Sequence, residues 1–181
     1  MTCVVGIEIG GLVWLGGDAS CLDEEGDAVV TQRQSKVFRR GGYIVGFAGS
    51  FQVGDLLKYQ VKFPTKLTKD HPRQISEAIQ EAFQVKKLKN DADWSALVGF
   101  GNQLFIVQHD FYTYRHAKPY AAIGAASAVA VALGTLCTLD RVGAKKQMSG
   151  RARLKLALEN AASFSSNVRD PWKFTQTRRP K

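Results

Sequence analysis

The stretch TCVVGIEIGGLVWLGGD, residues 2–18, decides the fold. Its two halves are apolar and rich in β-branched residues, and Gly10-Gly11 between them is a turn signal, so the stretch predicts a β-hairpin. Apolar and polar residues do not alternate cleanly along it, as they would in a sheet with one face in water. We therefore expect the hairpin to belong to a sheet that is covered on both faces.

Outward from the hairpin, blocks of expected strands alternate twice with pairs of expected helices. The further strands are expected at 35–39, 43–48, 95–100, 103–108, 111–115 and 120–123, and the helices at 53–62, 72–87, 124–137 and 151–163. The first fifty residues resemble an antiparallel meander. A parallel βαβ fold would alternate single elements, so it is excluded. The order predicts an α+β fold, a four-layer αββα sandwich of two antiparallel sheets flanked by helix pairs.

Composition indicates a globular chain with a basic C-terminal part. The 181 residues are 45% hydrophobic and 23% charged, and the net charge is +9. Residues 141–181 hold 11 Lys and Arg against two acids, so the rest of the chain is neutral. We expect one domain over 1–168 and a basic tail without regular structure over 169–181. A basic segment such as 141–181 is most often a solvated helix face followed by a disordered tail, although it could contact an acidic neighbour in a ring. Nucleic-acid binding is disfavoured because the body is neutral.

Other features argue against export, against a bound metal ion and against a membrane-spanning segment. Cys3, Cys21 and Cys137 form neither a disulfide framework nor a zinc pattern, so we expect a cytoplasmic protein without metal or cofactor. The N-terminus lacks the basic region and long apolar run of a signal peptide. The uncharged run 119–139 contains seven alanines and only six Ile, Leu or Val residues. This composition favours a packed helix over a membrane span.

Thr2 is the candidate nucleophile. The sequence has no HExxH, GxSxG, P-loop or GxGxxG motif, and His71, His109 and His116 are expected on the surface or in loops. Methionine before a small residue is normally removed, which would leave Thr2 with a free amine. Its hydroxyl could then act as nucleophile and its amine, with an ordinary pKa of about 7.7–8.0, as base. A buried lysine nearby would lower that pKa.

Five short motifs in fixed order carry a resemblance to a known family. They are Thr2-Cys-Val-Val-Gly-Ile, Gly16-Gly17-Asp18, Ser35-Lys36-Val37, Ile44-Val-Gly-Phe-Ala-Gly49 and Ala122-Ile-Gly124. Together they resemble the proteasome β-subunit family, and most closely its bacterial HslV peptidases. The loop before Lys36 is about two residues longer than in that family. The family fold is a four-layer αββα sandwich, which agrees with the block order.

The resemblance implies a role for each matching residue. Thr2 would be the nucleophile, and Lys36 would lower the pKa of its amine. Asp18 would pair with Lys36, and the N–H of Gly49 would stabilise the oxyanion. Each has a simpler alternative: Lys36 as a solvated strand residue, Asp18 as a turn residue and Gly49 as the end of a strand.

Substrate and auxiliary residues follow from the same resemblance. An extended substrate would add a strand beside Ser20 and Cys21 on one side and residues 47–49 on the other. Phe47 would line the first specificity pocket, with Phe51 narrowing it.

The auxiliary hydrogen-bond network departs from the family pattern. Ala125 stands where the family has a serine, although Ser127 is close. Ser163 stands at the family's aspartate, and Ser166 at its second serine. The network therefore looks thinned.

Three functions remain open. The first is a threonine endopeptidase that cleaves polypeptides inside rings of its own copies, with stacked hexamers forming a dodecamer and a separate ATP-dependent unfoldase as a partner. The second is a catalytically silent relative with a structural or assembly role, which Ala125 and Ser163 favour. The third is an N-terminal nucleophile amidase that acts on small amides without a closed ring.

Overall fold

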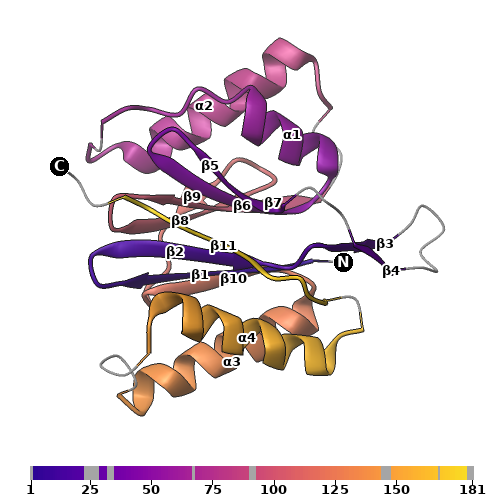
Figure 1. Ribbon diagram of the computed structural model, residues 1–181. Helices are drawn as coiled ribbons and strands as arrows, with labels where there is room; N and C mark the ends of the chain where they lie inside the picture. Colours follow the sequence, from indigo (N-terminus) through magenta and orange to yellow (C-terminus); the bar gives the residue numbers. More distant parts are fainter. Residues whose placement is uncertain are drawn as a thin grey trace.

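Four layers make up the structure (Figure 1). The computed structural model describes residues 2–22, 29–31, 35–66, 68–89, 93–143, 148–166 and 168–178. Helices α1 (Phe51–Tyr59) and α2 (His71–Lys86) lie above two facing sheets, and helices α3 (Ala126–Arg141) and α4 (Gly150–Phe164) lie below them. All strand pairs are antiparallel. The expected α+β sandwich with αββα layers is confirmed.

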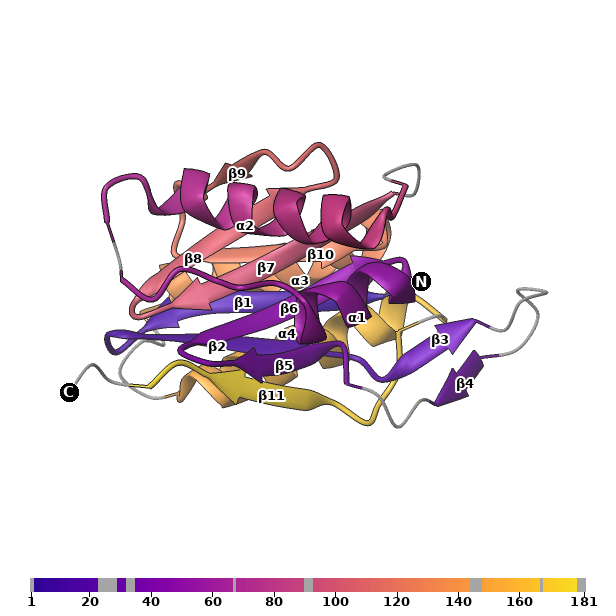
Figure 2. The same ribbon diagram turned by 90° about the horizontal axis from the view of Figure 1, so that it is seen from above.

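The upper sheet has the order β5-β6-β7-β8-β9, and the lower sheet has the order β10-β1-β2-β11. The strands are β1 (Cys3–Ile9), β2 (Leu12–Gly17), β5 (Val37–Arg40), β6 (Tyr43–Gly49), β7 (Trp94–Phe100), β8 (Gln103–Gln108), β9 (Thr113–Tyr114), β10 (Tyr120–Gly124) and β11 (Lys173–Gln176). A separate ribbon of β3 (Ser20–Leu22) and β4 (Val29–Thr31) extends from the body near the N-terminus (Figure 2).

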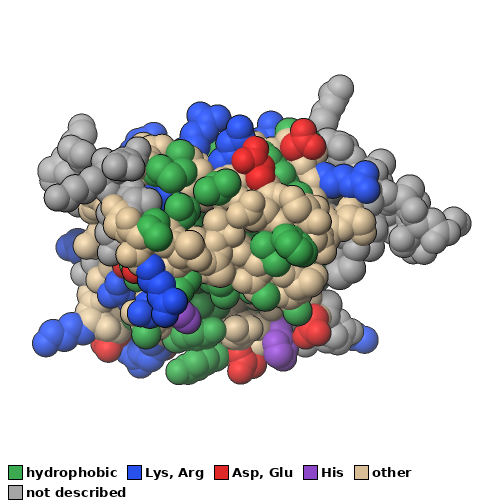
Figure 3. Space-filling view, turned by 90° about the horizontal axis from the view of Figure 1, so that it is seen from below, with side chains coloured by type: hydrophobic (Ala, Val, Ile, Leu, Met, Phe, Trp, Pro, Cys, Tyr) green, Lys and Arg blue, Asp and Glu red, His purple; other side chains and the backbone are tan. Residues whose placement is uncertain are grey.

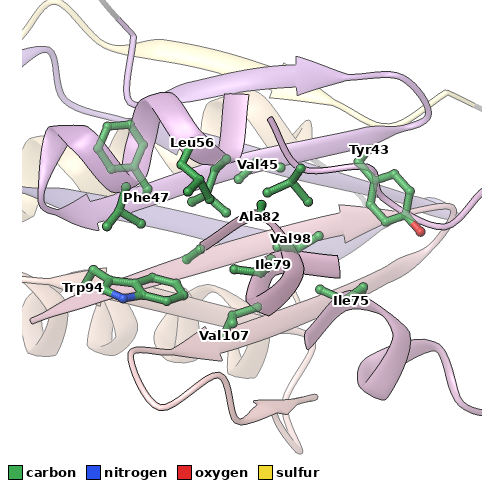
Figure 4. Packing of buried hydrophobic residues seen from close by; sticks show 14 of the residues in the cluster. Tyr43, Val45, Phe47, Leu56, Ile75, Ile79, Ala82, Trp94, Val98 and Val107 are labelled. Carbon is green, nitrogen blue, oxygen red and sulfur yellow. The ribbon is translucent and has the colours of Figure 1, made fainter. Parts of the chain in front are cut away.

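Hydrophobic side chains fill the three spaces between the layers. Above the upper sheet, Val45 of β6 packs with Leu56 of α1 and Ile79 of α2 (Figure 4). Between the sheets the strands approach closely, because a Cβ on Gly46 would lie 2.5 Å from Val4 Cγ1. Both faces of β1 are therefore covered, which explains why its sequence does not alternate.

The first fifty residues do not form one meander. β1 and β2 pair in the lower sheet, whereas β5 and β6 pair in the upper sheet. Local periodicity distinguishes strands from helices, but it does not say which sheet a hairpin joins.

Two helices end at other residues than expected. Helix α1 ends at Tyr59 because Val61 is fully buried, with its N–H donating to the carbonyl of Leu56. Helix α3 continues to Arg141, past the single Gly134, because no proline interrupts it and the first glycine with positive φ after it is Gly143.

The uncharged run 119–139 supplies β10 and most of α3. Small residues let α3 pack closely against α4 and the lower sheet: Ala128 and Ala132 are fully buried, in one cluster with Ala157 and Ala161 of α4. Among the helices that the structure describes, none has both the length and the apolar character that crossing a bilayer requires.

The segment expected to be a tail without regular structure contributes a strand. β11 pairs with β2, and Phe174 covers Gly16, where a Cβ would lie 2.9 Å from the ring. Thr177 is buried; its hydroxyl donates to the carbonyl of Gly101 and accepts a hydrogen bond from the N–H of Val13. A four-residue strand is too short to show a period, which explains the difference.

His71 is also placed differently from the expectation of a surface histidine. It begins α2 and is fully buried, with its Nε2 2.8 Å from the Tyr43 hydroxyl. The ring of Phe100 stacks on Tyr43 and lies 5.1 Å from the His71 ring. Burial lowers the pKa of His71.

Candidate active site

The β1–β2 hairpin brings Thr2 and Asp18 to the same end of the lower sheet. Val4 pairs with Gly17, so the residue before β1 and the residue after β2 meet. The N–H of Cys3 donates to Asp18 Oδ1 at 3.0 Å, and the N–H of Asp18 donates to the carbonyl of Cys3 at 3.3 Å. Asp18 is thereby fixed beside the backbone that leads to Thr2.

Lys36 approaches Asp18 from the upper sheet. It precedes β5, and the N–H of Phe47 donates to its carbonyl at 3.0 Å. Its Nζ lies 3.0 Å from Asp18 Oδ2, and the two side chains are only 3% and 0% exposed. A buried charge of either sign is costly when unpaired, so each of these residues requires the other. The ion pair implied by the resemblance is present, and the alternative of a solvated Lys36 does not describe this structure.

Cys3 is the other potential nucleophile next to Thr2. Burial, assisted by the Asp18 carboxylate, raises the pKa of its thiol to about 12, although Lys36 opposes this. Only a thiolate is a good nucleophile, so Cys3 acts as a packing residue. The hydroxyl of Thr2 is therefore the better candidate.

Two glycines with positive φ flank Thr2. Gly124 has φ +121°, and a Cβ there would lie 1.8 Å from the carbonyl oxygen of Thr2. That oxygen accepts a hydrogen bond from the N–H of Ala125 at 2.8 Å. Gly49 has φ +101°, and its Cβ would lie 2.3 Å from the carbonyl oxygen of Asp93. Both positions require glycine, because an L side chain would meet strain and backbone atoms together.

A cavity of about 580 Å³ opens beside Thr2. This volume lies within the usual range of small-ligand and substrate sites. The lining residues are Thr2, Ala48, Gly49, Phe51, Asp93, Trp94, Ser95, Gln108, His109, Gly124 and Ala125. Thr2 and Gly49 thus line the same space, as the proposed roles of nucleophile and oxyanion donor require.

Phe47 was expected to line the first specificity pocket, and Phe51 to narrow it. Phe51 lines the cavity. Phe47 lies beneath it: it is 6% exposed, contacts Phe51 edge to face and fills the space over Gly54, where a Cβ would be 2.2 Å from its ring. Phe47 therefore supports the wall of the cavity in this structure.

The three auxiliary serines are not among the residues that line the cavity. Ser127 is exposed in the first turn of α3. Ser163 is exposed on α4, and its hydroxyl donates to the carbonyl of Glu159. Ser166 is exposed after α4, and its carbonyl accepts a hydrogen bond from Arg169. Ser20 and Cys21 form part of the backbone of β3, and their side chains lie outside the described residues.

Sequence reasoning missed the far wall of the cavity. Ser95 and Gln108 pair across β7 and β8, and both line the cavity. The His109 ring nitrogen lies 4.0 Å from the exposed Asp93 carboxylate at the rim. The β7–β8 hairpin itself was predicted, but no local signal showed that its end faces Thr2. Within the described ranges, no group of three or more His, Cys, Asp or Glu residues is arranged to hold a metal ion.

Comparison with solved structures identifies the fold. The BPH of Thiobacillus denitrificans, in complex with epoxomicin, superposes with a TM-score of 0.80 at 17% identity, covering 99% of this chain and 100% of that one. The HslV of Trypanosoma brucei gives 0.69 at 19% identity over 97% and 98%. Anbu, an ancestral β-subunit from Yersinia bercovieri, gives 0.68 at 14% identity over 97% and 81%.

The chain has the HslV/proteasome β-type fold. The expected resemblance is confirmed at the level of fold. No protein-family model matches the sequence, and no curated protein matches it significantly. The structure joins Lys36 to Asp18, joins Asp18 to the backbone next to Thr2, and places Thr2 and Gly49 on one cavity; the catalytic roles of these four residues stay a prediction.

Proposed function

We propose that this protein is an N-terminal threonine peptidase that hydrolyses polypeptides. The observation that carries the proposal is the buried Lys36–Asp18 pair, joined through the backbone of Cys3 to Thr2 beside an open cavity. The likeness in fold to HslV and BPH supports a hydrolase, and the glycine at position 49 supports an oxyanion donor.

The chemistry uses this chain's own groups in four steps. Removal of Met1 frees the α-amine of Thr2. The amine accepts the hydroxyl proton while the oxygen attacks the substrate carbonyl, and the N–H of Gly49 stabilises the oxyanion. The leaving amine takes the proton, and an ester with Thr2 remains. Water then hydrolyses the ester. Lys36, held by Asp18, keeps the amine neutral because a second positive charge nearby is unfavourable.

Self-association into rings forms part of the proposal. The outward residues of α3 include Ala126, Ala130, Gly134 and Thr138, all exposed and uncharged. In Figure 3 most charged side chains on the α3–α4 face lie toward its rim. Such a face suits close contact between copies, because few charges would lose water. Stacked hexamers and a separate ATP-dependent unfoldase remain the assembly that we propose.

The test is covalent labelling with epoxomicin, the compound bound in the BPH structure. This epoxyketone reacts with both the hydroxyl and the free amine of an N-terminal threonine. We expect the intact mass to lack Met1 and to gain one adduct. Thr2→Ser, which keeps both reactive groups, should still be labelled, whereas Thr2→Ala should not. Absence of the adduct on a Met1-free wild-type chain would contradict the proposal.

A catalytically silent relative is the second candidate. Ala125 offers no hydroxyl next to Thr2, and Ser127, Ser163 and Ser166 do not line the cavity. A silent protein would lose Met1 and yet remain unlabelled. It would also form the same assembly, measured by native mass spectrometry, with Thr2→Ala as with the wild type.

A further inference from the structure

A second cavity lies at the opposite end of β1 from Thr2. It has a volume of about 400 Å³, and its lining residues come from β1 and β10 of the lower sheet, from α3 and α4, and from adjoining turns. Its lining residues are Ile7, Glu8, Ile9, Gly10, Pro119, Tyr120, Leu136, Asp140 and Arg153. At about 3.3 Å per strand residue, Ile9 lies roughly 20 Å from Thr2, so this cavity is separate from the candidate active site.

Arg153 is the unusual residue of this cavity. The helical pattern of α4 places basic residues outward, yet Arg153 is only 2% exposed. Its Nε donates to the carbonyl of Met148 at 3.3 Å, whereas its Nη2 is buried without a hydrogen-bond partner. Within the described part of the chain, no acidic side chain lies within 4.0 Å of the guanidinium. Buried arginines are normally paired, because an uncompensated charge is costly.

Packing of the first turn of α4 holds Arg153 inward. Gly150 allows the helix to lie on Trp14, since a Cβ there would come within 2.6 Å of the indole. Ser149 caps the helix by accepting a hydrogen bond from the N–H of Ala152. Leu154 follows in the core. Arg153 cannot turn outward without rotating this anchored turn.

The walls around Arg153 are mainly apolar. Ile7 and Ile9 project from β1 toward α3 and α4, and Leu136 lies among them. Glu8 projects to the other side of the sheet, where its carboxylate accepts a hydrogen bond from the N–H of Leu104 and pairs with Arg115. The Glu8 carboxylate therefore does not neutralise Arg153.

Two further titratable groups face the cavity. A hydrogen bond with Cys137, together with burial, raises the pKa of Tyr120 to about 12, so the Tyr120 hydroxyl stays neutral at ordinary pH. Asp140 is half-buried near the end of α3 and lines the cavity.

We propose that this cavity binds a monocarboxylate with an aliphatic or aromatic body. A guanidinium presents a planar fork of donors that matches a carboxylate, and Arg153 lines the cavity with its Nη2 lacking a hydrogen-bond partner. The isoleucines and Leu136 cover an apolar body of moderate size. This site requires no chemistry from Thr2, so it stands independently of the proposed peptidase activity.

The experiment titrates the full chain with 4-methylpentanoate and with 3-phenylpropanoate, followed by NMR shifts and calorimetry. The neutral probe is 4-methylpentan-1-ol, which has the same apolar body as the first acid. We expect saturable binding of at least one acid. The alcohol should bind at least about tenfold more weakly, since a charged hydrogen bond is lost.

Variants locate the site. Arg153→Met keeps an apolar side chain of similar length and should lose at least about tenfold in affinity for the acid. Lys155→Met removes an exposed charge from the same helix and should bind like the wild type. Ile9→Phe fills part of the cavity from its half-buried edge and should also weaken binding, which keeps the test decisive if Arg153→Met does not fold.

Four results would overturn the proposal. They are no saturable binding of either acid to the folded wild-type chain, equal binding of the alcohol, unchanged affinity in folded Arg153→Met, and unchanged affinity in Ile9→Phe.

Discussion

Replacement of Lys36 by methionine tests the central ion pair of the candidate site. The variant keeps an apolar side chain of similar length but leaves the Asp18 carboxylate buried without its cation. At 3.0 Å and an effective dielectric constant of about 20, the Coulomb attraction between the two charges is about 5.5 kcal/mol. In the wild type, much of this attraction offsets the free energy lost when the two charges leave water. The variant loses the attraction, while the Asp18 carboxylate remains buried. We expect the free energy of unfolding to fall by about 3–5 kcal/mol.

The assay is urea unfolding at fixed protein concentration, read by tryptophan fluorescence. Arg73→Met is the matched control: Arg73 pairs with Glu77 at 3.7 Å, but both side chains are largely exposed, so a loss of no more than about 1 kcal/mol is expected. The double variant Lys36→Met/Asp18→Asn removes both charges and should recover part of the lost stability.

Two outcomes would refute this reasoning. One is a loss below about 1 kcal/mol in Lys36→Met, which would mean that Asp18 does not depend on Lys36. The other concerns the double variant. If it is less stable than Lys36→Met by as much as Asp18→Asn alone is less stable than the wild type, the two residues act independently.

Three further predictions address other parts of the molecule. Gly49→Ala should destabilise the fold by about 1–3 kcal/mol in the same unfolding assay and abolish epoxomicin labelling, because φ is +101° and its Cβ would lie 2.3 Å from the Asp93 carbonyl; a labelled variant of wild-type stability would contradict this. Thr177→Val keeps the shape but leaves the N–H of Val13 unpaired, so a loss of about 1–3 kcal/mol is expected, and an unchanged midpoint would show that this contact does not hold β11. Since burial lowers the pKa of His71 in the folded state, the unfolded chain binds its proton first as pH falls. Stability should therefore decrease below about pH 6.5 and level off below the folded-state pKa, and His71→Gln should show a smaller decrease between pH 7 and 5.

The sequence alone predicted that Thr2 and Asp18 lie close together, because they stand at the two ends of one predicted hairpin. Asp18 ends the hairpin that Thr2 begins, so antiparallel pairing alone brings them together. The position of Lys36 required the resemblance, because its partner lies in another sheet. Gln108 and His109 could not be found in this way, since only the stacking of the two sheets turns the end of β8 toward Thr2.

The errors in the fold have a common physical origin. Periodicity assigns charged and ionisable residues to solvent, and it therefore misplaced His71 and Arg153, which are buried by their contacts with Tyr43 and by the anchored turn of α4. β11 was missed for a different reason. Its four residues are held by pairing with β2 and by Thr177, both contacts with residues more than 150 positions away.

The backbone contacts that hold Thr2 in place do not depend on the bond between Met1 and Thr2. The carbonyl oxygen of Thr2 is held by the N–H of Ala125, and the next N–H, that of Cys3, is held by Asp18. Both anchors lie on the C-terminal side of the peptide bond that removal of Met1 would break. Cleavage of that bond would therefore expose an amine on a residue already in place, with no rearrangement of the strands. Under the proposed mechanism, the timing of activation would be set by the enzyme that removes Met1 and by its access to the chain end, and a folded chain that keeps Met1 would be inactive.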